Sequence, residues 1–347
     1  MKRIFKLILT VSISSMMIIV MNHHTTNAET LTPYVKFESI DSSKNIKMTF
    51  DASDNSNAIG NLEYSTDNNS YTPISTTTIE SNVIYIRSNT TNTSISEAFK
   101  NINFNNDTKV SGNVLALLDF QHMDTCTTDT GCFFGLFQST QHLVDASLLE
   151  LTSFQLSDSM YSSMFAGSVD LVNGPTLNAL TLSEECYSEM FEDCKSLKTS
   201  PTLPATTLAT GCYYMMFKGC TALEIVPVLN ATVGKESCYE GMFEGCTSLD
   251  IVESKDSTHT DPWSIPASFV EDDDWNNDMF SSSSACNELE EGNLVIGKIY
   301  YQKGTTTSSS TLTNNSKTSS NTTSNTASTT TPINSTSTYT APNTCGD

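Results

Sequence analysis

The sequence predicts an α/β repeat solenoid of the leucine-rich-repeat type, preceded by a small all-β sandwich and followed by a disordered tail. Three observations predict this arrangement: a 26-residue repeat in the middle of the chain, alternating apolar and polar residues before it, and a Ser/Thr-rich segment after it. The 347 residues suffice for two modest domains with terminal extensions. The predicted boundaries are a signal peptide at 1–28, an immunoglobulin-like β-sandwich at 29–112, a solenoid with a degraded last unit at 113–303 and the tail at 304–347.

Residues 1–28 have the three regions of a secretory signal peptide. A basic start over Met1–Lys6 precedes an apolar stretch over Leu7–Met21, and we expect cleavage after Ala28. The alternative is an N-terminal membrane anchor, but the apolar stretch of about 15 residues is shorter than the roughly 20 that a spanning helix needs. The sequence therefore predicts a secreted, extracellular or cell-surface protein with no transmembrane segment in the mature chain.

The chain is strongly acidic. It carries 17 Lys and Arg residues against 39 Asp and Glu residues, a net charge of −22, and loss of the leader changes this value to −25 because the leader contains Lys2, Arg3 and Lys6. Binding to nucleic acids and to anionic lipid depends on basic side chains that displace counterions. The composition therefore excludes nucleic acid as a partner.

The region before the repeats alternates apolar and polar side chains in short runs separated by turn-forming residues. This period of two is typical of strands with one buried face, and several such runs predict a small antiparallel sandwich. The paired Cys of an antibody-type core is missing, so the domain would be an immunoglobulin-like module without its disulfide. The runs are Tyr34–Phe37, Ile46–Phe50, Leu62–Ser65 and Val83–Ile86.

The repeat is marked by a Met-Phe pair that recurs at a constant step of 26, at 164–165, 190–191, 216–217 and 242–243. Leu, Pro, Ala, Cys-Tyr and a second Cys recur at the same step. The preceding unit, with Leu136-Phe137, fits at a step of 28, and a degraded unit with Met279-Phe280 follows a polar insertion. Degenerate ends are typical of capping repeats.

Within a unit, Leu208, Cys212 and Met216 fall at i, i+4 and i+8, which predicts one apolar face of a short helix. The segment Leu223–Leu229 is rich in branched residues and predicts a short strand. Pro227 has no backbone N–H, so it is expected at a position where the strand does not need to donate a hydrogen bond to its neighbour. One strand and one helix per 20–29 residues is the leucine-rich-repeat plan, in which parallel strands line one face.

The strings Cys-Tyr-x-x-Met-Phe-x-x-Cys-x-x-Leu and Leu-Pro-Ala-Thr-Thr-Leu-Ala resemble those of the BspA-like leucine-rich repeat surface proteins. The resemblance is specific over 113–253 and weakens through 254–303. It implies a secreted or surface-exposed protein that mediates adhesion or recognises host or matrix macromolecules. The departures are Met160 and Ser168, which replace the Cys pair of one unit, and the polar, acidic last unit.

The ten cysteines leave two interpretations open. An even number in a secreted chain suggests disulfides. Two cysteines eight residues apart on one helix, such as Cys186 and Cys194, would lie about 12 Å apart, beyond the roughly 7 Å limit for a bridge. We therefore favour buried free thiols over bridges between adjacent units, while Cys126 and Cys132 could close a short loop. The absence of Cys-x-x-Cys or a His partner argues against zinc.

The acidic run Glu271–Asp274, with Asp278, offers hard oxygen ligands for calcium. A calcium loop beginning at Asp272 would have Asn277 at the position of the sharp-turn Gly and Ser283 at that of the bidentate Glu. The motif therefore fails. A solvated acidic loop is favoured, and an irregular calcium site stays the alternative.

No catalytic motif accompanies these features. Histidine is the usual general base and metal ligand, and outside the leader the chain has only the scattered His122, His142 and His259. We predict that the protein is not an enzyme, with no catalytic, cofactor-binding or metal-binding residues and no cofactor, and the sequence does not identify binding residues. The expected function is recognition or adhesion through the solenoid face, and the alternative is a structural surface or coat component with no defined ligand.

The tail is predicted to be disordered because 26 of the 41 residues from Gly304 to Thr344 are Ser or Thr, which leaves little apolar surface to offset the entropy of ordering. It would serve as a stalk, spacer or glycan carrier, or only as a solubilising tail. Its three sequons begin at Asn314, Asn321 and Asn334.

Overall fold

The computed structural model describes residues 33–50, 59–75, 78–152, 156–272, 274–284 and 294–303. The predicted α/β solenoid of parallel strands and short helices is wrong. The regular sheets are almost entirely antiparallel, and the one helix lying wholly within the described residues is the four-residue α3 (Ala116–Asp119). The predicted signal peptide and the predicted tail lie outside the described residues.

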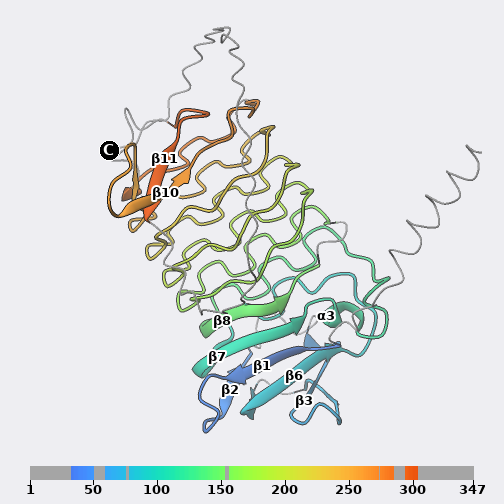
Figure 1. The fold of residues 1–347 in the computed structure, drawn as a ribbon. Coiled ribbons are helices and arrows are strands. Elements are labelled where there is room, and N and C mark those ends of the chain that lie inside the picture. Colours follow the sequence, from blue (N-terminus) through green and yellow to red (C-terminus); the bar gives the residue numbers. More distant parts are fainter. Residues whose placement is uncertain are drawn as a thin grey trace, which may run out of the picture.

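The N-terminal part is one curled eight-stranded sheet at one end of the molecule (Figure 1). Its order is β4-β3-β6-β1-β7-β2-β5, and β8 adds to β7. All pairs are antiparallel except β7 with β8. The strands are β1 (Val35–Ser39), β2 (Ile46–Thr49), β3 (Leu62–Ser65), β4 (Thr72–Pro73), β5 (Thr78–Ser81), β6 (Val83–Ser88), β7 (Asn103–Asn113) and β8 (Gln141–Glu150).

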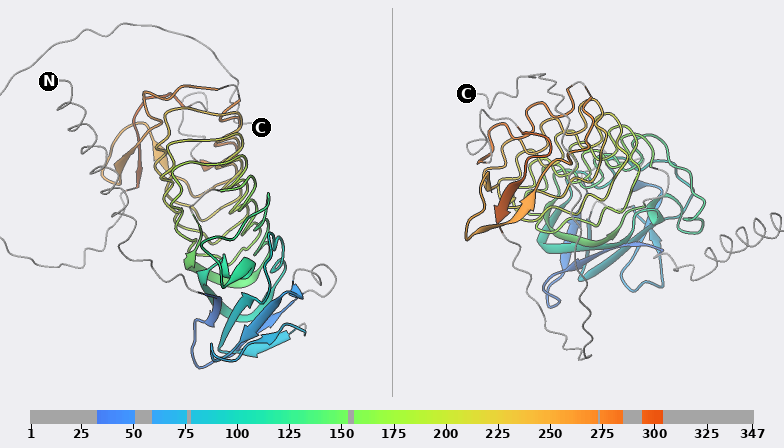
Figure 2. Two further views of the ribbon diagram at one scale, coloured as in Figure 1. Left: turned by 90° about the vertical axis from the view of Figure 1, so that its right-hand side faces the viewer. Right: turned by 45° about the horizontal axis from the view of Figure 1, so that its top comes forward.

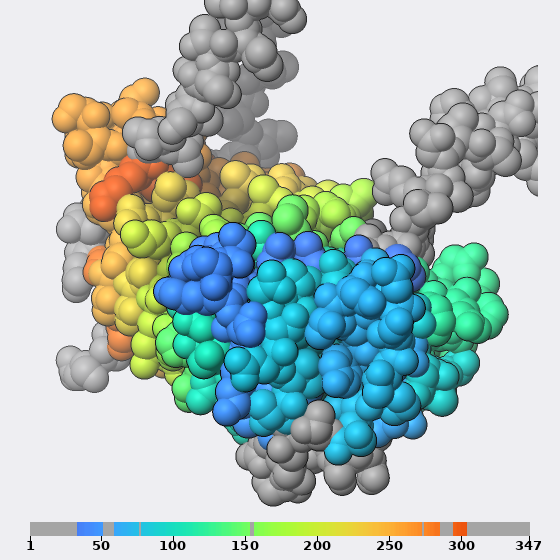
Figure 3. Space-filling model, turned by 90° about the horizontal axis from the view of Figure 1, so that it is seen from below, coloured from blue at the N-terminus to red at the C-terminus, as the bar shows by residue number. Residues whose placement is uncertain are grey.

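The predicted strands exist, but the predicted two-sheet sandwich is wrong. Alternate residues of β1 and β6 are buried, as the period of two requires. The buried face packs on the start of the repeat region and not on a second sheet: Phe37 of β1 lies 5.6 Å from Phe99 and 6.1 Å from Phe137, ring centre to ring centre. The core therefore continues from the sheet into the repeats. Figure 3 shows the outer face of this sheet covering the end of the molecule.

Beyond β8, successive repeat units lie side by side and lead away from the sheet (Figure 2). In the turn segment of each unit, the N–H groups alternate between two kinds of acceptor. The N–H of Tyr187 donates to the carbonyl of Cys212 in the next unit at 3.1 Å, and the N–H of Ser188 donates back to Glu185 at 3.0 Å. An α-helix would instead place every bond four residues back along the chain. The predicted helix over Leu208–Met216 is therefore replaced by tight turns.

The backbone angles explain why no helix forms there. Every fourth residue of the turn segment has a positive φ, a conformation that interrupts a right-handed helix and that glycine adopts most easily. In one unit these residues are Glu185, Glu189 and Asp193, and in the next they are Gly211, Met215 and Gly219, with φ between 49° and 71°.

The predicted parallel strands are reduced to isolated bridges. Neighbouring units meet through single parallel bridges, such as Thr199 with Ile225 and Leu203 with Leu229. Pro201 and Pro227 lie between these bridges and have no N–H to donate to a ladder. Continuous parallel strands therefore cannot form along this side.

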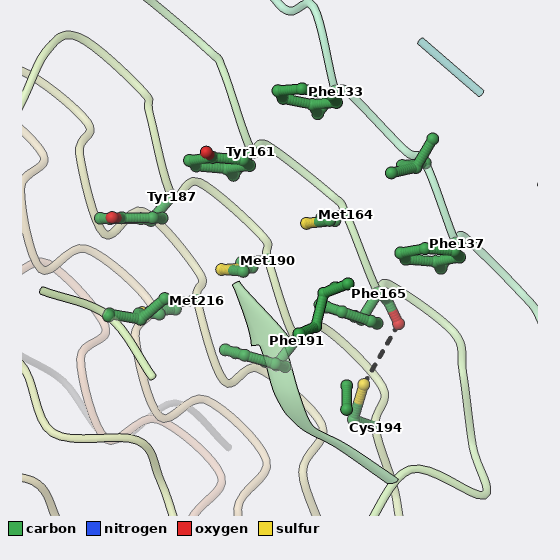
Figure 4. Close-up of a cluster of buried hydrophobic side chains, with 14 of the residues drawn as sticks. Phe133, Phe137, Tyr161, Met164, Phe165, Tyr187, Met190, Phe191, Cys194 and Met216 are labelled. Carbon is green, nitrogen blue, oxygen red and sulfur yellow. Dashed lines mark hydrogen bonds between the residues drawn. The ribbon is translucent and has the colours of Figure 1, made fainter. Parts of the chain in front are cut away.

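Side chains that recur every 26 residues form aromatic columns through the core (Figure 4). Phe165, Phe191, Phe217 and Phe243 stack with ring centres 5.6–5.7 Å apart and planes within 4° of parallel. A parallel column of Tyr161, Tyr187, Tyr213 and Tyr239 has spacings of 5.8–6.0 Å. The rings of the two columns are buried, so each unit supplies part of its neighbour's core.

The far end is closed by a three-stranded sheet of β9 (Ile251–Val252), β10 (His259–Trp263) and β11 (Tyr300–Lys303). Trp263 donates its indole N–H to the carbonyl of Pro227 at 2.9 Å. The side-chain amide of Gln302 accepts from the N–H of Val226 at 2.8 Å and donates to its carbonyl at 3.2 Å. These buried contacts fasten the small sheet to the last regular unit.

We expect the stability of this end to fall as the pH rises above neutrality. His259 Nδ1 lies 2.8 Å from Asp256 Oδ2, and Nε2 lies 3.1 Å from Asp250 Oδ1. The hydrogen bond to Asp256 and the nearby Asp250 raise the pKa of His259 above its usual value of about 6.5. The protonated His259 therefore stabilises the folded state fully below about pH 6.5, and this contribution is lost as the pH rises through the raised pKa of His259.

Urea unfolding at a series of pH values tests this expectation. The midpoint should decline on the alkaline side of about pH 6.5 in the native chain, and His259→Gln should remove that decline. A decline of the same size in the variant would show that another group causes it.

Candidate recognition surface

The outer side of the turn segments is acidic. Its carboxylates follow the repeat from unit to unit; they are Asp158, Glu184, Glu185, Glu189, Glu192, Asp193, Glu236, Glu240 and Glu244. Lys218 lies among them, with its Nζ 2.9 Å from Glu244. Partial burial, together with the negative charge of Glu189, raises the pKa of Glu192. This side repels other acidic surfaces.

A second side of the repeat region, within the described residues, presents a run of uncharged side chains in each unit. We call it the Thr/Val face, and it consists of exposed, uncharged side chains that occupy equivalent positions in successive units. They are Thr176, Asn178, Leu180, Thr181, Thr202, Thr206, Thr207, Val228, Asn230, Thr232, Val233 and Val270. Because the chain has a net charge of −22, an uncharged surface that extends over several units differs from the acidic turn segments.

Backbone contacts between units hold the Thr/Val face in register. Thr181 forms a parallel bridge with Thr207, and Val233 forms one with Val270. The side chain of Asn230 donates to the carbonyl of Leu203 in the preceding unit at 3.1 Å. The face is therefore held by contacts between neighbouring units.

A hollow of about 910 Å³ lies where the Thr/Val face meets β8 and the segment after α3. Its buried apolar side chains are Leu115, Met123, Leu149, Leu156 and Met160. Leu148 also lines it and is 69% exposed. Volumes of roughly 300–1,000 Å³ with an apolar lining and a few polar groups are typical of ligand sites.

One edge of β8 opens into this hollow. On its other edge, β8 pairs with β7 through Leu148 and Leu149. Toward the next unit, Asp145 bridges Asn173, and among the described residues no further bridge follows along Ser147–Leu149. The chain beyond Asn173 continues into Pro175, which has no N–H to donate. Thr176 and Asn178 of that chain also line the hollow.

The eight cysteines within the described residues are all free thiols, and the six in the repeats are buried. This confirms the interpretation that we favoured over bridges between units. Cys194, Cys220 and Cys246 each donate to the carbonyl of a Phe in the preceding unit at 3.0–3.2 Å. Ser168, which replaces the thiol in the irregular unit, makes the corresponding bond to Phe137 at 2.7 Å. The column is therefore held by hydrogen bonds and packing. Cys286 and Cys345 lie outside the described residues.

We expect at least eight titratable thiols when the purified chain is unfolded in guanidinium without reductant and titrated with a thiol reagent. Of these eight described thiols, only Cys126 should react readily in the native state, because it is partly exposed whereas the other seven are buried, and burial raises the pKa of Cys132, for example, to about 12. Finding six or fewer thiols in the unfolded chain would contradict this prediction.

The other residues singled out in the sequence do not come together. Among the described residues, no group of three or more His, Cys, Asp or Glu side chains is arranged to hold a metal ion. Glu271, Asp272, Asp274 and Asp278 belong to the last unit, and Asp273 lies outside the described part. Separate aspartates accompany the histidines: Asp119 with His122, Asp107 with His142, and Asp250 and Asp256 with His259.

The part of the chain that the structure describes contains no helix able to cross a membrane. Comparison with known proteins gives no match: no protein-family model, no curated protein and no solved structure matches the chain.

Two features of the surface escaped the sequence analysis. The Thr/Val face is spread over four units, and its only sequence signal is the lack of charge over 175–183, 201–211 and 225–234. The hollow combines residues between Asn113 and Asn178 and has no local motif.

Proposed function

We propose that this protein is a secreted or surface-exposed recognition protein that binds a host or matrix macromolecule through the Thr/Val face and is not an enzyme. The observation that carries the proposal is the lack of charge on that face in a chain with a net charge of −22. Charged groups are depleted at the centres of protein interfaces, because they must lose their water on binding.

The chemistry of the face fits this role. The Thr hydroxyls donate and accept hydrogen bonds, and their methyl groups, with Val228, Val233 and Val270, offer apolar contact. The units present these groups on a backbone that is already ordered, so binding costs little conformational entropy. The acidic turn segments on the other side would keep copies of the protein apart.

Two sequence features support the same proposal. The predicted signal peptide at 1–28 would direct the chain out of the cell, and the resemblance to the BspA-like surface proteins implies adhesion or recognition. The Thr/Val face now takes the place of the strand-lined solenoid face that the sequence had predicted.

The test is a solid-phase binding assay of the full chain on matrix proteins and on glycans, with two matched variants. Thr207→Glu places a charge on the Thr/Val face, and Thr210→Glu places the same charge three residues further on, in the acidic turn segment. We expect saturable binding that Thr207→Glu weakens by at least about tenfold and Thr210→Glu changes by less than about twofold.

Equal effects of the two substitutions would show that the Thr/Val face is not the binding surface. The absence of saturable binding at micromolar concentration would favour the alternative, a structural surface or coat component without a defined ligand.

A further inference from the structure

We propose that the hollow beside β8 binds an extended peptide segment that adds to the open edge of the strand, inserts an aliphatic side chain and carries a basic residue next to it. The proposal rests on the proposed function, since the hollow shares Thr176 and Asn178 with the Thr/Val face. It assigns to the surface both a specific subsite and the chemical class of its partner.

The first argument is the apolar interior. Leu115, Met123 and Leu156 are each between 7% and 9% exposed and line a space of about 910 Å³. Leu148, at 69% exposed, covers one side of it. Burying an aliphatic side chain in such a space contributes favourably by removing apolar surface from water on both partners.

The second argument is the strand edge. Leu148 and Leu149 of β8 pair with β7 on one side, beyond a shift of register between Asp145 and Leu148. On the other side, the neighbouring chain bridges β8 at Asp145 with Asn173, no further bridge follows among the described residues, and Pro175 has no N–H to donate. An extended peptide can pair with such an edge through its main chain, while pockets for alternate side chains give specificity.

The third argument is charge. The two charged residues that line the hollow, Asp124 and Glu150, are both acidic, and no Lys or Arg is among its lining residues. The negative charge of the whole chain adds to their field. A basic residue beside the inserted side chain is therefore favoured over an acidic one.

The experiment uses the full chain and fluorescein-labelled synthetic peptides, with binding measured by fluorescence anisotropy. The probe is an extended, Thr-rich hexapeptide with one central Leu flanked by Lys. Three control peptides replace the Leu by Ala, replace the Lys residues by Glu, or methylate the backbone nitrogens. We expect saturable binding of the probe, at least about tenfold weaker binding of each control, and weakening with added salt.

Two matched protein variants locate the site. Leu148→Glu introduces a charge at the rim of the hollow, and Leu180→Glu introduces the same charge on the Thr/Val face outside it. Both side chains are more than half exposed, so both variants are expected to fold. Leu148→Glu should weaken probe binding by at least about tenfold and Leu180→Glu by less than about twofold.

The outcomes separate this proposal from the proposed function. No probe binding, or equal effects of the two variants, overturns the peptide site even if Thr207→Glu still abolishes binding to a matrix macromolecule. Probe binding that only Leu148→Glu weakens supports the peptide site, including when the Thr/Val face binds nothing. Stronger binding of the Glu-containing peptide would overturn the assignment of a basic partner.

Discussion

Phe217→Ala is expected to lower the free energy of unfolding by about 3–5 kcal/mol, the range for truncating a large aromatic side chain in a packed core. Phe217 is fully buried and stacks between Phe191 and Phe243, at 5.6 and 5.7 Å. Truncation would remove two ring contacts and leave a cavity between neighbouring units. Urea unfolding followed by circular dichroism measures the loss.

Phe280→Ala is the matched comparison in the last unit. Phe280 stacks on Phe243 at 5.2 Å, and its other ring contact is the edge of Trp263 at 6.1 Å. These surroundings are less polar than the sequence suggested, but no further Phe of the column follows within the described residues. We expect a smaller loss than at Phe217. Equal losses, or a mild effect at Phe217, would show that adjacent units are not coupled through the column.

The sequence predicted the buried side chains better than the backbone that carries them. The Phe, Tyr and Cys residues that recur every 26 residues are the ones that lie in the core. Their spacing within a unit, however, is compatible with two backbones. Leu208, Cys212 and Met216 would share one face of a helix, and they share the inner side of four-residue turns equally well.

Two signals favoured turns over a helix. Apolar residues that recur strictly every four residues, without any step of three, do not stay on one face of an α-helix, because the helix has 3.6 residues per turn. Glycine also occurs inside the predicted helix, at Gly211, and again just beyond its end, at Gly219; inside a helix glycine costs about 1 kcal/mol per residue. In the structure both residues have a positive φ.

The first unit was missed because it comes before β7 in the sequence. The segment 95–101 donates hydrogen bonds to 132–138, and Phe99 stacks on Phe137 at 5.7 Å. Ala98-Phe99 thus takes the place of a Met-Phe pair, but it lies 38 residues before Leu136-Phe137. A search at a constant step cannot find it. The segment instead supplies the packing partner for which the sequence analysis had predicted a second sheet.

Gly112→Ala is expected to destabilise the chain by at least about 3 kcal/mol, because backbone strain and a backbone clash act together. Gly112 lies in β7 opposite Val35 of β1 and has a φ of 91°. A Cβ atom there would lie 2.2 Å from the carbonyl oxygen of Tyr34. Strand β1 cannot easily move away, since it pairs with β6 on one side and β7 on the other.

Gly131→Ala is the control for the strain alone. Gly131 has a φ of 64°, but a Cβ atom there would meet nothing closer than 3.5 Å. Its replacement should therefore cost only about 1–2 kcal/mol. In hydrogen exchange, Gly112→Ala should also lower the protection of β1 and of β8, because β7 pairs with both strands. Similar losses of stability in the two variants would show that the contact between Gly112 and Tyr34 does not fix the position of β1.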